Sequence, residues 1–254
     1  MTSVGFKVVS FKDRPDLLEA ADAITPTVWP EFMLNDPVAN RYWFRLYEVF
    51  PEYQFTLLEK GTDDIIAVGN SLPLVWEKDW HDLPDDGWDW ALAQGFKDRE
   101  AGRSPTTQCA LSITIARPYQ GKGISAHVVS MMRSIGEAHG LNALIAPVRP
   151  SQKTHYPLIP IDRYVHWRNS DGLPFDAWLR VHARLGAEII KVCPQAMTIP
   201  GTVEQWEAWA KMRFPESGVY TVPGALVPVT IDCEANQGTY IEPNVWMCHP
   251  IRHQ

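Results

Sequence analysis

The hydrophobic positions along the chain change their period from one segment to the next. Between residues 108 and 116, Leu111, Ile113 and Ile115 alternate with polar residues, which is the period of a half-buried strand. Between residues 123 and 139 the apolar residues recur at helical spacing instead. The two segments therefore predict a strand followed by an amphipathic helix, with a tight turn between them.

The same reading, extended over the whole chain, predicts alternating strands and helices. Strands are expected at 4–11, 53–59, 65–74, 108–116, 141–148, 188–198, 219–222 and 226–231. Helices are expected at 13–21, 36–49, 89–100, 123–139, 174–185 and 202–212, and residues 242–247 read as part of a tail. We expect one α/β domain over residues 1–254, with insertions at about 75–107 and 149–173.

Charge and length exclude several classes of protein. The chain has 254 residues, with 30 acidic and 23 basic side chains and a net charge of −7. A nonspecific nucleic-acid binder usually has the opposite balance, so no nucleic-acid partner is expected. No stretch approaches the ~18 apolar residues of a membrane span, and the first residues lack the pattern of a secretion signal. We expect a cytoplasmic protein that has no membrane partner.

The cysteines and histidines do not form a metal motif. Cys109, Cys193, Cys233 and Cys248 are far apart in the sequence, and none belongs to a CxxC pair. We therefore expect free thiols and no bound metal. His249, next to Cys248 in the tail, is interpreted as incidental.

A glycine-containing turn between the clearest strand and the helix carries the candidate chemistry. It reads Gln120-Gly121-Lys122-Gly123-Ile124-Ser125-Ala126. Glycines leave the backbone N–H groups uncovered at the positive end of the helix dipole, and a lysine adds charge, so the turn can hold a phosphate group. An ordinary glycine-rich strand–helix turn is the alternative interpretation.

Three kinds of phosphate-binding loop compare with this turn. A Walker loop needs Gly-x4-Gly-Lys-Ser/Thr, and here Gly123 follows Lys122, which excludes that loop. The dinucleotide fingerprint is met by Gly121, Gly123 and Ala126. Arg149 follows the next predicted strand and is suited to a 2′-phosphate, so NADP binding stays open. The third kind is an acetyl-CoA loop, and it matches best.

The turn resembles the acetyl-CoA signature Gln/Arg-x-x-Gly-x-Gly/Ala of the GCN5-related N-acetyltransferase (GNAT) superfamily. Gln120 and Gly123 fill the first two fixed positions, and Ser125 stands where Gly or Ala is usual. Many members also have Tyr-x-x-x-Gly-Phe near the end of a later helix, and His182-Ala-Arg-Leu-Gly186 stands there in this chain. Residues 178–206 are similar to a GNAT subgroup that is sometimes joined to nitrilase-like domains.

The resemblance implies a mixed, mostly antiparallel twisted sheet, flanked by helices and splayed between two central strands. It also implies acetyl-CoA or another acyl-CoA as co-substrate, held in the opening between those strands. Arg149 is a further candidate, for a CoA phosphate or a substrate carboxylate. The candidate CoA-binding residues are Ile113, Thr114, Ile115, Gln120, Gly121, Lys122, Gly123, Ile124, Ser125, Ala126 and Arg149.

The implied reaction is direct transfer of an acyl group from acyl-CoA to an amine of a small molecule. In many members the tyrosine of the downstream motif protonates the leaving thiolate, and His182 stands at that position here. An imidazole titrates near neutrality, so His182 is the candidate general acid, with Tyr164 as an alternative. The strand before the turn has no acidic residue, and Asp162, Glu242 or a chain of waters are the candidate bases.

Tryptophans in the two insertions are the candidate acceptor-binding residues. The chain has 11 Trp. Trp76, Trp88 and Trp90 lie among acidic residues in the first insertion, and Trp167 lies in the second. Such a mixture suits a pocket for a cationic or aromatic amine, or an acidic solvated loop that its indoles pin to the domain.

Two other functions stay open on the sequence. The first is a non-catalytic acyl-CoA-binding sensor or interaction module on the same fold, because the strand acid and the usual tyrosine are missing. The second is an NADP-binding reductase. The oligomeric state stays open as well, with a homodimer as one possibility.

Overall fold

A nine-stranded mixed sheet forms the centre of the computed structural model, which describes residues 5–251. Its strand order is β1-β2-β3-β4-β5-β9-β8-β7, and β6 pairs with β9 as well. The strands are β1 (Phe6–Ser10), β2 (Gln54–Glu59), β3 (Ile65–Leu74), β4 (Thr107–Ile115), β5 (Ala143–Val148), β6 (Glu188–Gly201), β7 (Gly218–Tyr220), β8 (Val229–Asp232) and β9 (Gln237–Pro250).

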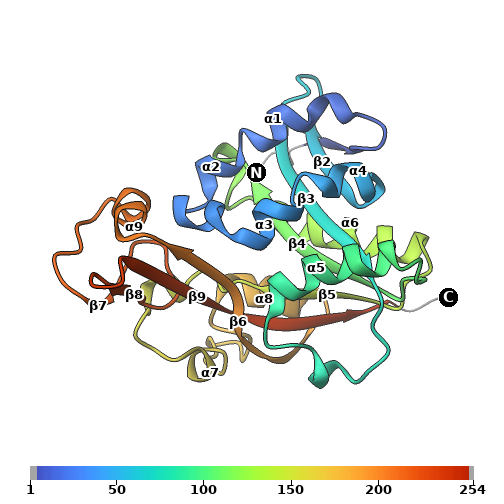
Figure 1. Ribbon diagram of the computed structural model, residues 1–254. Helices are drawn as coiled ribbons and strands as arrows, with labels where there is room; N and C mark the ends of the chain where they lie inside the picture. Colours follow the sequence, from blue (N-terminus) through green and yellow to red (C-terminus); the bar gives the residue numbers. More distant parts are fainter. Residues whose placement is uncertain (1–4, 252–254) are drawn as a thin grey trace.

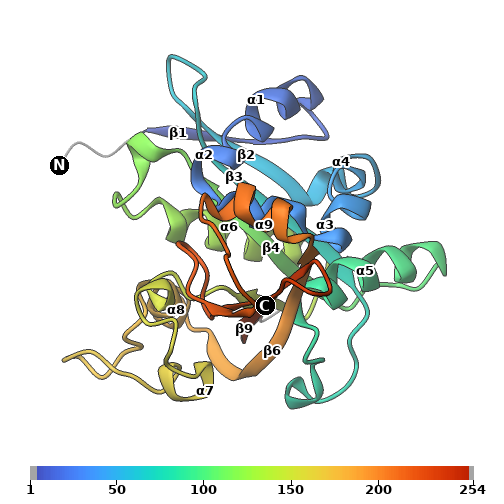
Figure 2. The same ribbon diagram turned by 60° about the vertical axis from the view of Figure 1, so that its left-hand side comes forward.

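Helices cover the sheet and connect its strands (Figure 1). The α-helices are α1 (Leu18–Asp22), α2 (Thr25–Val28), α3 (Pro37–Tyr42), α4 (Arg45–Val49), α5 (Gly87–Glu100), α6 (Ile124–Ala138), α7 (Ile161–Tyr164), α8 (Ala177–Arg184) and α9 (Val203–Ala210). Short 3-10 helices are η1 (Pro15–Leu17), η2 (Glu31–Asn35), η3 (Pro51–Tyr53), η4 (Trp80–Asp82), η5 (Arg117–Tyr119) and η6 (Lys153–His155). Figure 2 shows α7 and α8 at the opposite end of the molecule from α1 and β1.

The two faces of the sheet carry different helices. On one face, Phe96 of α5 and Trp246 of β9 belong to the largest apolar core. On the other face, Val128 of α6 packs in a second core, and Leu179 of α8 packs with Met247 of β9 in a third. Alternate residues of β9 therefore face α5 and α8, which is the period of a strand buried on both sides.

Strands β4 and β5 are parallel and pair only briefly. Gln108 and Cys109 pair with Leu144 and Ile145, and within residues 5–251 the two strands make no further pairing. A register shift also leaves Leu111 of β4 without a partner on β3. The sheet thus opens between β4 and β5, as the resemblance implies. All other strand pairs are antiparallel, which differs from the doubly wound parallel sheet of a dinucleotide-binding fold.

Most predicted elements are confirmed to within a few residues, and two predictions are wrong. The region predicted as a tail contains β9, which pairs with β5, β6 and β8. The apolar pattern of β9 is interrupted by Glu242, Pro243 and Asn244, so the sequence did not indicate a strand there. The strand is nevertheless buried along most of its length. The predicted helix 36–49 is two short helices, α3 and α4.

Candidate active site

The turn before α6 leaves the first N–H groups of the helix uncovered. Gly121 and Gly123 have φ values of 72° and 75°, a left-handed backbone that residues with a Cβ rarely adopt. Gly123 is the N-cap of α6, and no side chain caps this helix. Gln120 donates from Nε2 to the carbonyl of Ile115 at 2.9 Å, which fixes the turn to the end of β4. An uncapped N-terminus of a 15-residue helix can bind phosphate oxygens.

A cavity of about 630 Å³ lies at the opening between β4 and β5. Ile113 and Ile115 of β4 and Ser125 of α6 line it, and so do Trp178 and His182 of α8. These residues place one part of the cavity beside the uncapped turn. The cavity therefore provides room for a CoA arm next to a phosphate site. The uncapped N–H groups at the start of α6 are the donors that suit the phosphates of this co-substrate.

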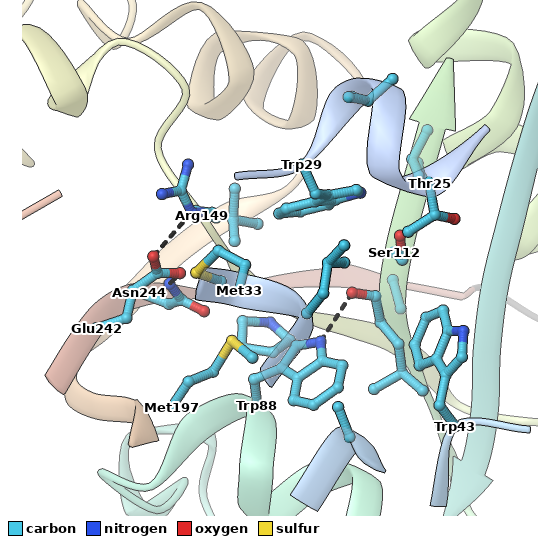
Figure 3. Close-up of a pocket in the computed structure, with 18 of the residues that line it drawn as sticks. Thr25, Trp29, Met33, Trp43, Trp88, Ser112, Arg149, Met197, Glu242 and Asn244 are labelled. Carbon is cyan, nitrogen blue, oxygen red and sulfur yellow. Dashed lines mark hydrogen bonds and ion pairs between the residues drawn. The ribbon is translucent and has the colours of Figure 1, made fainter. Parts of the chain in front are cut away.

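The other part of the cavity has aromatic and thioether walls (Figure 3). Trp29, Trp43 and Trp88 contribute three indoles, and Met33 and Met197 contribute two thioethers. The rings of Trp43 and Trp88 are stacked with centroids 6.1 Å apart. Large rigid side chains of this kind suit a flat or extended ligand.

Two indoles of this wall are anchored to β4. Trp88 donates from Nε1 to the carbonyl of Leu111 at 2.8 Å, and Trp29 donates from Nε1 to Oγ1 of Thr114 at 3.1 Å. The register shift leaves Leu111 without a partner on β3, so the hydrogen bond from Trp88 holds β4 at this residue. Both residues line the cavity.

A buried ion pair forms the polar end of this wall. Arg149 donates from Nε to Oε2 of Glu242 at 2.8 Å and from Nη2 to the carbonyl of Gly224 at 2.6 Å. Tyr240 and Asn244 donate to the two oxygens of the same carboxylate. Burial is the largest single effect and lowers the pKa of Arg149, but Glu242 and Tyr240 together outweigh it and keep that pKa above its usual value. Arg149 therefore stays charged at the cavity wall.

His182 forms a pair with a second buried histidine. Its Nδ1 lies 2.8 Å from Nε2 of His249 on β9. Burial, and then the nearby His249, lower the pKa of His182 to about 3, while burial and then Arg133 lower the pKa of His249 to about 4. The expectation that this imidazole titrates near neutrality is therefore wrong, because the pair is buried and stays uncharged at pH 7.

A buried carboxyl, Asp36, and a partly buried one, Asp89, influence the pKa of one another. Asp36, the N-cap of α3, accepts from the N–H of Ala39 at 2.7 Å, and Asp89 of α5 accepts from the N–H of Thr198 at 3.2 Å. One oxygen of each carboxyl has no partner within residues 5–251. Burial is the main cause that raises the pKa of both, and the charge of Asp36 raises that of Asp89 further. We therefore expect the pair to share a proton.

This pair predicts a pH-dependent stability. A carboxyl whose pKa is raised in the folded state stabilises fully below its unfolded pKa of about 3.8 and loses that contribution as the pH rises. Asp89→Asn removes the charge and keeps an oxygen that can accept from the N–H of Thr198. We expect its melting temperature to gain on the wild type as the pH rises from about 5 to 8. Each unit by which the pKa is raised corresponds to ~1.4 kcal/mol in the free energy of unfolding. Each kcal/mol changes the melting temperature of a domain of this size by ~2–4 °C.

Thermal scans at several pH values check this expectation. Asp82→Asn, at an exposed carboxyl in η4, is the matched control and should follow the wild type at every pH. A constant difference between Asp89→Asn and the wild type across this range would mean that the pair does not share a proton.

Several predicted site residues lie away from the cavity. Tyr164 is buried and donates to Oδ2 of Asp176 at 2.9 Å, and burial raises its pKa, so it holds the helix cap rather than a reacting group. Asp162 is exposed on α7. Trp76, Trp90 and Trp167 pack against core clusters and do not line the cavity.

Other predicted residues line the cavity or surround the turn. Residues that line the cavity are Trp88, Ile113, Ile115, Ser125, Arg149, His182 and Glu242. Thr114 is buried on β4, and the rest of the turn (Gln120, Gly121, Lys122, Gly123, Ile124 and Ala126) surrounds the start of α6. Arg149 takes Glu242 and Gly224 as partners and stands beside Trp29, with its guanidinium 6.0 Å from the ring.

Sequence reasoning missed the residues that come from the N-terminal helices and from β9. Trp29, Met33 and Trp43 line the cavity, although Trp29 and Met33 lie between two predicted helices and Trp43 lies in one that showed only helical periodicity. His249 was interpreted as an incidental residue of the tail, and its partner His182 is 67 positions away in the sequence. No local signal marks these residues, since only the tertiary fold brings them to the cavity.

Two kinds of site and segment are absent from the part of the chain that the structure describes. No group of three or more His, Cys, Asp or Glu side chains is arranged to hold a metal ion between residues 5 and 251. None of the helices in this range combines the length and the apolar character needed to cross a membrane. The four cysteines are free thiols, as predicted.

Comparisons with known proteins agree with this geometry. No protein-family profile matches the chain. An arginine N-acetyltransferase of Aspergillus versicolor is 32% identical over 276 aligned positions, which cover 97% of this chain and 94% of the relative.

Two solved structures share the fold. The loading GNAT-like domain of CurA from Lyngbya majuscula has a TM-score of 0.64 and 18% identity, covering 98% of this chain and 100% of that one. The GphF GNAT-like decarboxylase in complex with isobutyryl-CoA has a TM-score of 0.59 and 14% identity, covering 97% of this chain and 100% of that one.

Proposed function

Because the chain belongs to the GNAT superfamily and is an acyl-CoA-dependent N-acyltransferase, we propose that its small-molecule acceptor is arginine or a close analogue, acylated on the α-amine. One observation carries the proposal. The cavity has an acyl-CoA part beside the uncapped turn, and an acceptor part whose indole walls end at a fixed guanidinium. The name of the similar enzyme from Aspergillus versicolor supports arginine as the acceptor.

The indole walls favour a cationic side chain. A guanidinium is planar and weakly hydrated, and it stacks on the face of an indole with a gain of about 0.5–2 kcal/mol. Trp29, Trp43 and Trp88 offer such faces, and Arg149 lies over the ring of Trp29. The net charge of −7 also favours the approach of a cation.

Arg149 favours an acceptor that carries a carboxylate. A guanidinium has five N–H donors, and Arg149 uses two of them on Glu242 and Gly224. The side chain lines the cavity and is 16% exposed. Glu242 has no exposed surface and accepts from Arg149, Tyr240 and Asn244, so we assign it to hold Arg149 in place. An amino-acid carboxylate can then pair with a preformed cation.

The α-amine is the nitrogen of arginine that can attack a thioester. A guanidinium has a pKa above ~12 and stays protonated in a protein, so it offers no free lone pair. An α-amine is a much weaker base than a guanidinium and loses its proton more readily. The guanidinium therefore serves recognition, and the α-amine is the nucleophile.

The acyl-CoA part of the cavity supplies positioning and polarisation. The first N–H groups of α6 hold the pyrophosphate, and β4 holds the acyl arm along Ile113 and Ile115. The N–H of Leu111, at the register shift, polarises the thioester carbonyl. His182, on α8, lines the same cavity, and we place the thioester sulphur beside it.

A panel of acceptors tests the proposal. Release of the free CoA thiol from acetyl-CoA would be followed with arginine, citrulline and agmatine, and mass spectrometry would locate the acetyl group. Citrulline lacks the positive charge, and we expect kcat/KM about 10-fold below that of arginine. Agmatine lacks the carboxylate, and the loss of a charge-assisted hydrogen bond predicts a decrease of about 10–100-fold.

Two outcomes would contradict arginine as the acceptor. One is a higher kcat/KM with agmatine than with arginine, because Arg149 would then have no substrate carboxylate to bind. The other is equal turnover of arginine and citrulline, because the indole walls would then not select a cation.

A further inference from the structure

His182 and His249 form an uncharged pair of imidazoles that no acidic residue orients. Both side chains are buried, with 2% and 0% of their surface exposed. Nε2 of His182 and Nδ1 of His249 have no hydrogen-bond partner within residues 5–251. A buried ring nitrogen without a partner is costly, so two of them at the ends of one hydrogen-bonded pair call for an explanation.

The two histidines differ in their surroundings. His182 lines the main cavity, where we place the thioester sulphur. His249 is fully buried and does not line this cavity. His182 is therefore the member of the pair beside the cavity, and His249 lies behind it.

We propose that His249 is a positioning residue, which donates from Nε2 to Nδ1 of His182 and so keeps a proton on Nε2 of His182, facing the thioester sulphur. The proposal rests on the role assigned to His182 under the proposed function. It adds a partner that fixes the tautomer and the ring orientation of His182, as a second group does for many catalytic imidazoles.

The acid role assigned to His182 sets this direction of donation. A neutral imidazole carries one ring proton, so a proton on Nε2 of His182 leaves its Nδ1 as an acceptor. Nε2 of His249, 2.8 Å away, is then the donor. The carbonyl of Leu185, which also accepts from Nη1 of Arg133 at 3.2 Å, raises the pKa of His249 and is the competing acceptor for its ring proton.

The proton transfer is balanced without a charged imidazole. As the bond between the carbonyl carbon and sulphur breaks, its electron pair goes to sulphur, which takes the proton of His182 Nε2. At the same time Nδ1 of His182 takes the proton of His249 Nε2, and Nδ1 of His249 takes one from solvent. The amine separately releases one proton to solvent. This exchange explains how an uncharged histidine can donate a proton.

Two substitutions at position 249 and one control test the proposal in the full chain. His249→Leu removes the donor, and we expect kcat with acetyl-CoA to fall about 10-fold, with KM for acetyl-CoA changed less than about 2-fold. His249→Gln places an amide N–H near the position of the imidazole Nε2–H. It can donate to Nδ1 of His182, so we expect kcat to recover most of the loss seen with Leu. Cys248→Ala, on the same strand but facing the other side of the sheet, should stay within about 2-fold of the wild type.

A direct readout of the tautomer separates positioning from packing. ¹⁵N NMR of the histidine rings should show the proton of His182 on Nε2 in the wild type, and a loss of this single tautomer in His249→Leu. A proton on Nδ1 of His182 in the wild type would overturn the proposal, and so would equal losses of kcat in the Leu and Gln variants. If His182→Phe loses turnover while His249→Leu keeps it, only the role of His249 fails. If neither loses turnover, the role of His182 fails as well.

Discussion

Replacing His182 by Phe is expected to lower kcat about 100-fold while the affinity for CoA changes less than about 3-fold, because a positioned proton donor contributes about 10²–10⁴-fold. Phenylalanine fills a site of similar size, in which the imidazole is 2% exposed and packs at 4.4 Å, ring to ring, against Trp178. The substitution therefore removes the ring N–H without opening a space in the cavity wall. Thiol release from acetyl-CoA gives kcat, and a titration with CoA gives the affinity.

A matched control separates this effect from a general loss of folded protein. His155→Phe makes the same exchange at an exposed histidine in η6 and should stay within about 2-fold of the wild type. Unchanged kcat in His182→Phe would remove His182 from the reaction. A joint loss of kcat and CoA affinity would mean that the position only shapes the acyl-CoA site.

Replacing Gly123 by Val should abolish CoA binding at ordinary concentrations. Gly123 has a φ of 75°, which costs a β-branched residue about 1–3 kcal/mol, and the new side chain lies at the N-terminus of α6. Each hydrogen bond from a backbone N–H to a charged phosphate is worth about 1.5–3 kcal/mol. Losing two of them predicts a Kd for CoA at least about 100-fold higher. Calorimetry with CoA measures this change.

Gly140 provides a control on the same helix. It has a φ of 70° and lies just beyond the C-terminus of α6, and a Cβ there would meet nothing within 4 Å, as at Gly123. Gly140→Val should therefore cost similar stability but leave the Kd for CoA unchanged. If the two variants weaken CoA binding equally, the effect would be strain in the helix, and the turn would not be the phosphate site.

The acyl-CoA side of the site could be predicted from the sequence because its determinants are local. The alternation in β4, the glycine turn and the amphipathic α6 follow one another within residues 107–138. Their periods and backbone requirements are visible in a short window. His182 became a candidate in the same way, through a motif that lies within one helix and its end.

The acceptor side could not be predicted because its residues meet only in the fold. Trp29 and Trp43 directly follow the short helices α2 and α3, and Glu242 and Asn244 come from β9. A strand buried on both faces lacks the alternation that reveals a half-buried strand, so β9 was interpreted as a tail. The abundance of tryptophan indicated an aromatic pocket correctly, but only Trp88 of the four predicted indoles lines it.

A crystal structure of the protein with CoA and arginine tests the central claim most directly. We expect the CoA pyrophosphate on the first N–H groups of α6 and the sulphur within hydrogen-bond distance of His182 Nε2. We also expect arginine between Trp29, Trp43 and Trp88, with its carboxylate on Arg149. A pyrophosphate bound at Arg149, or arginine bound outside the cavity, would contradict the claim.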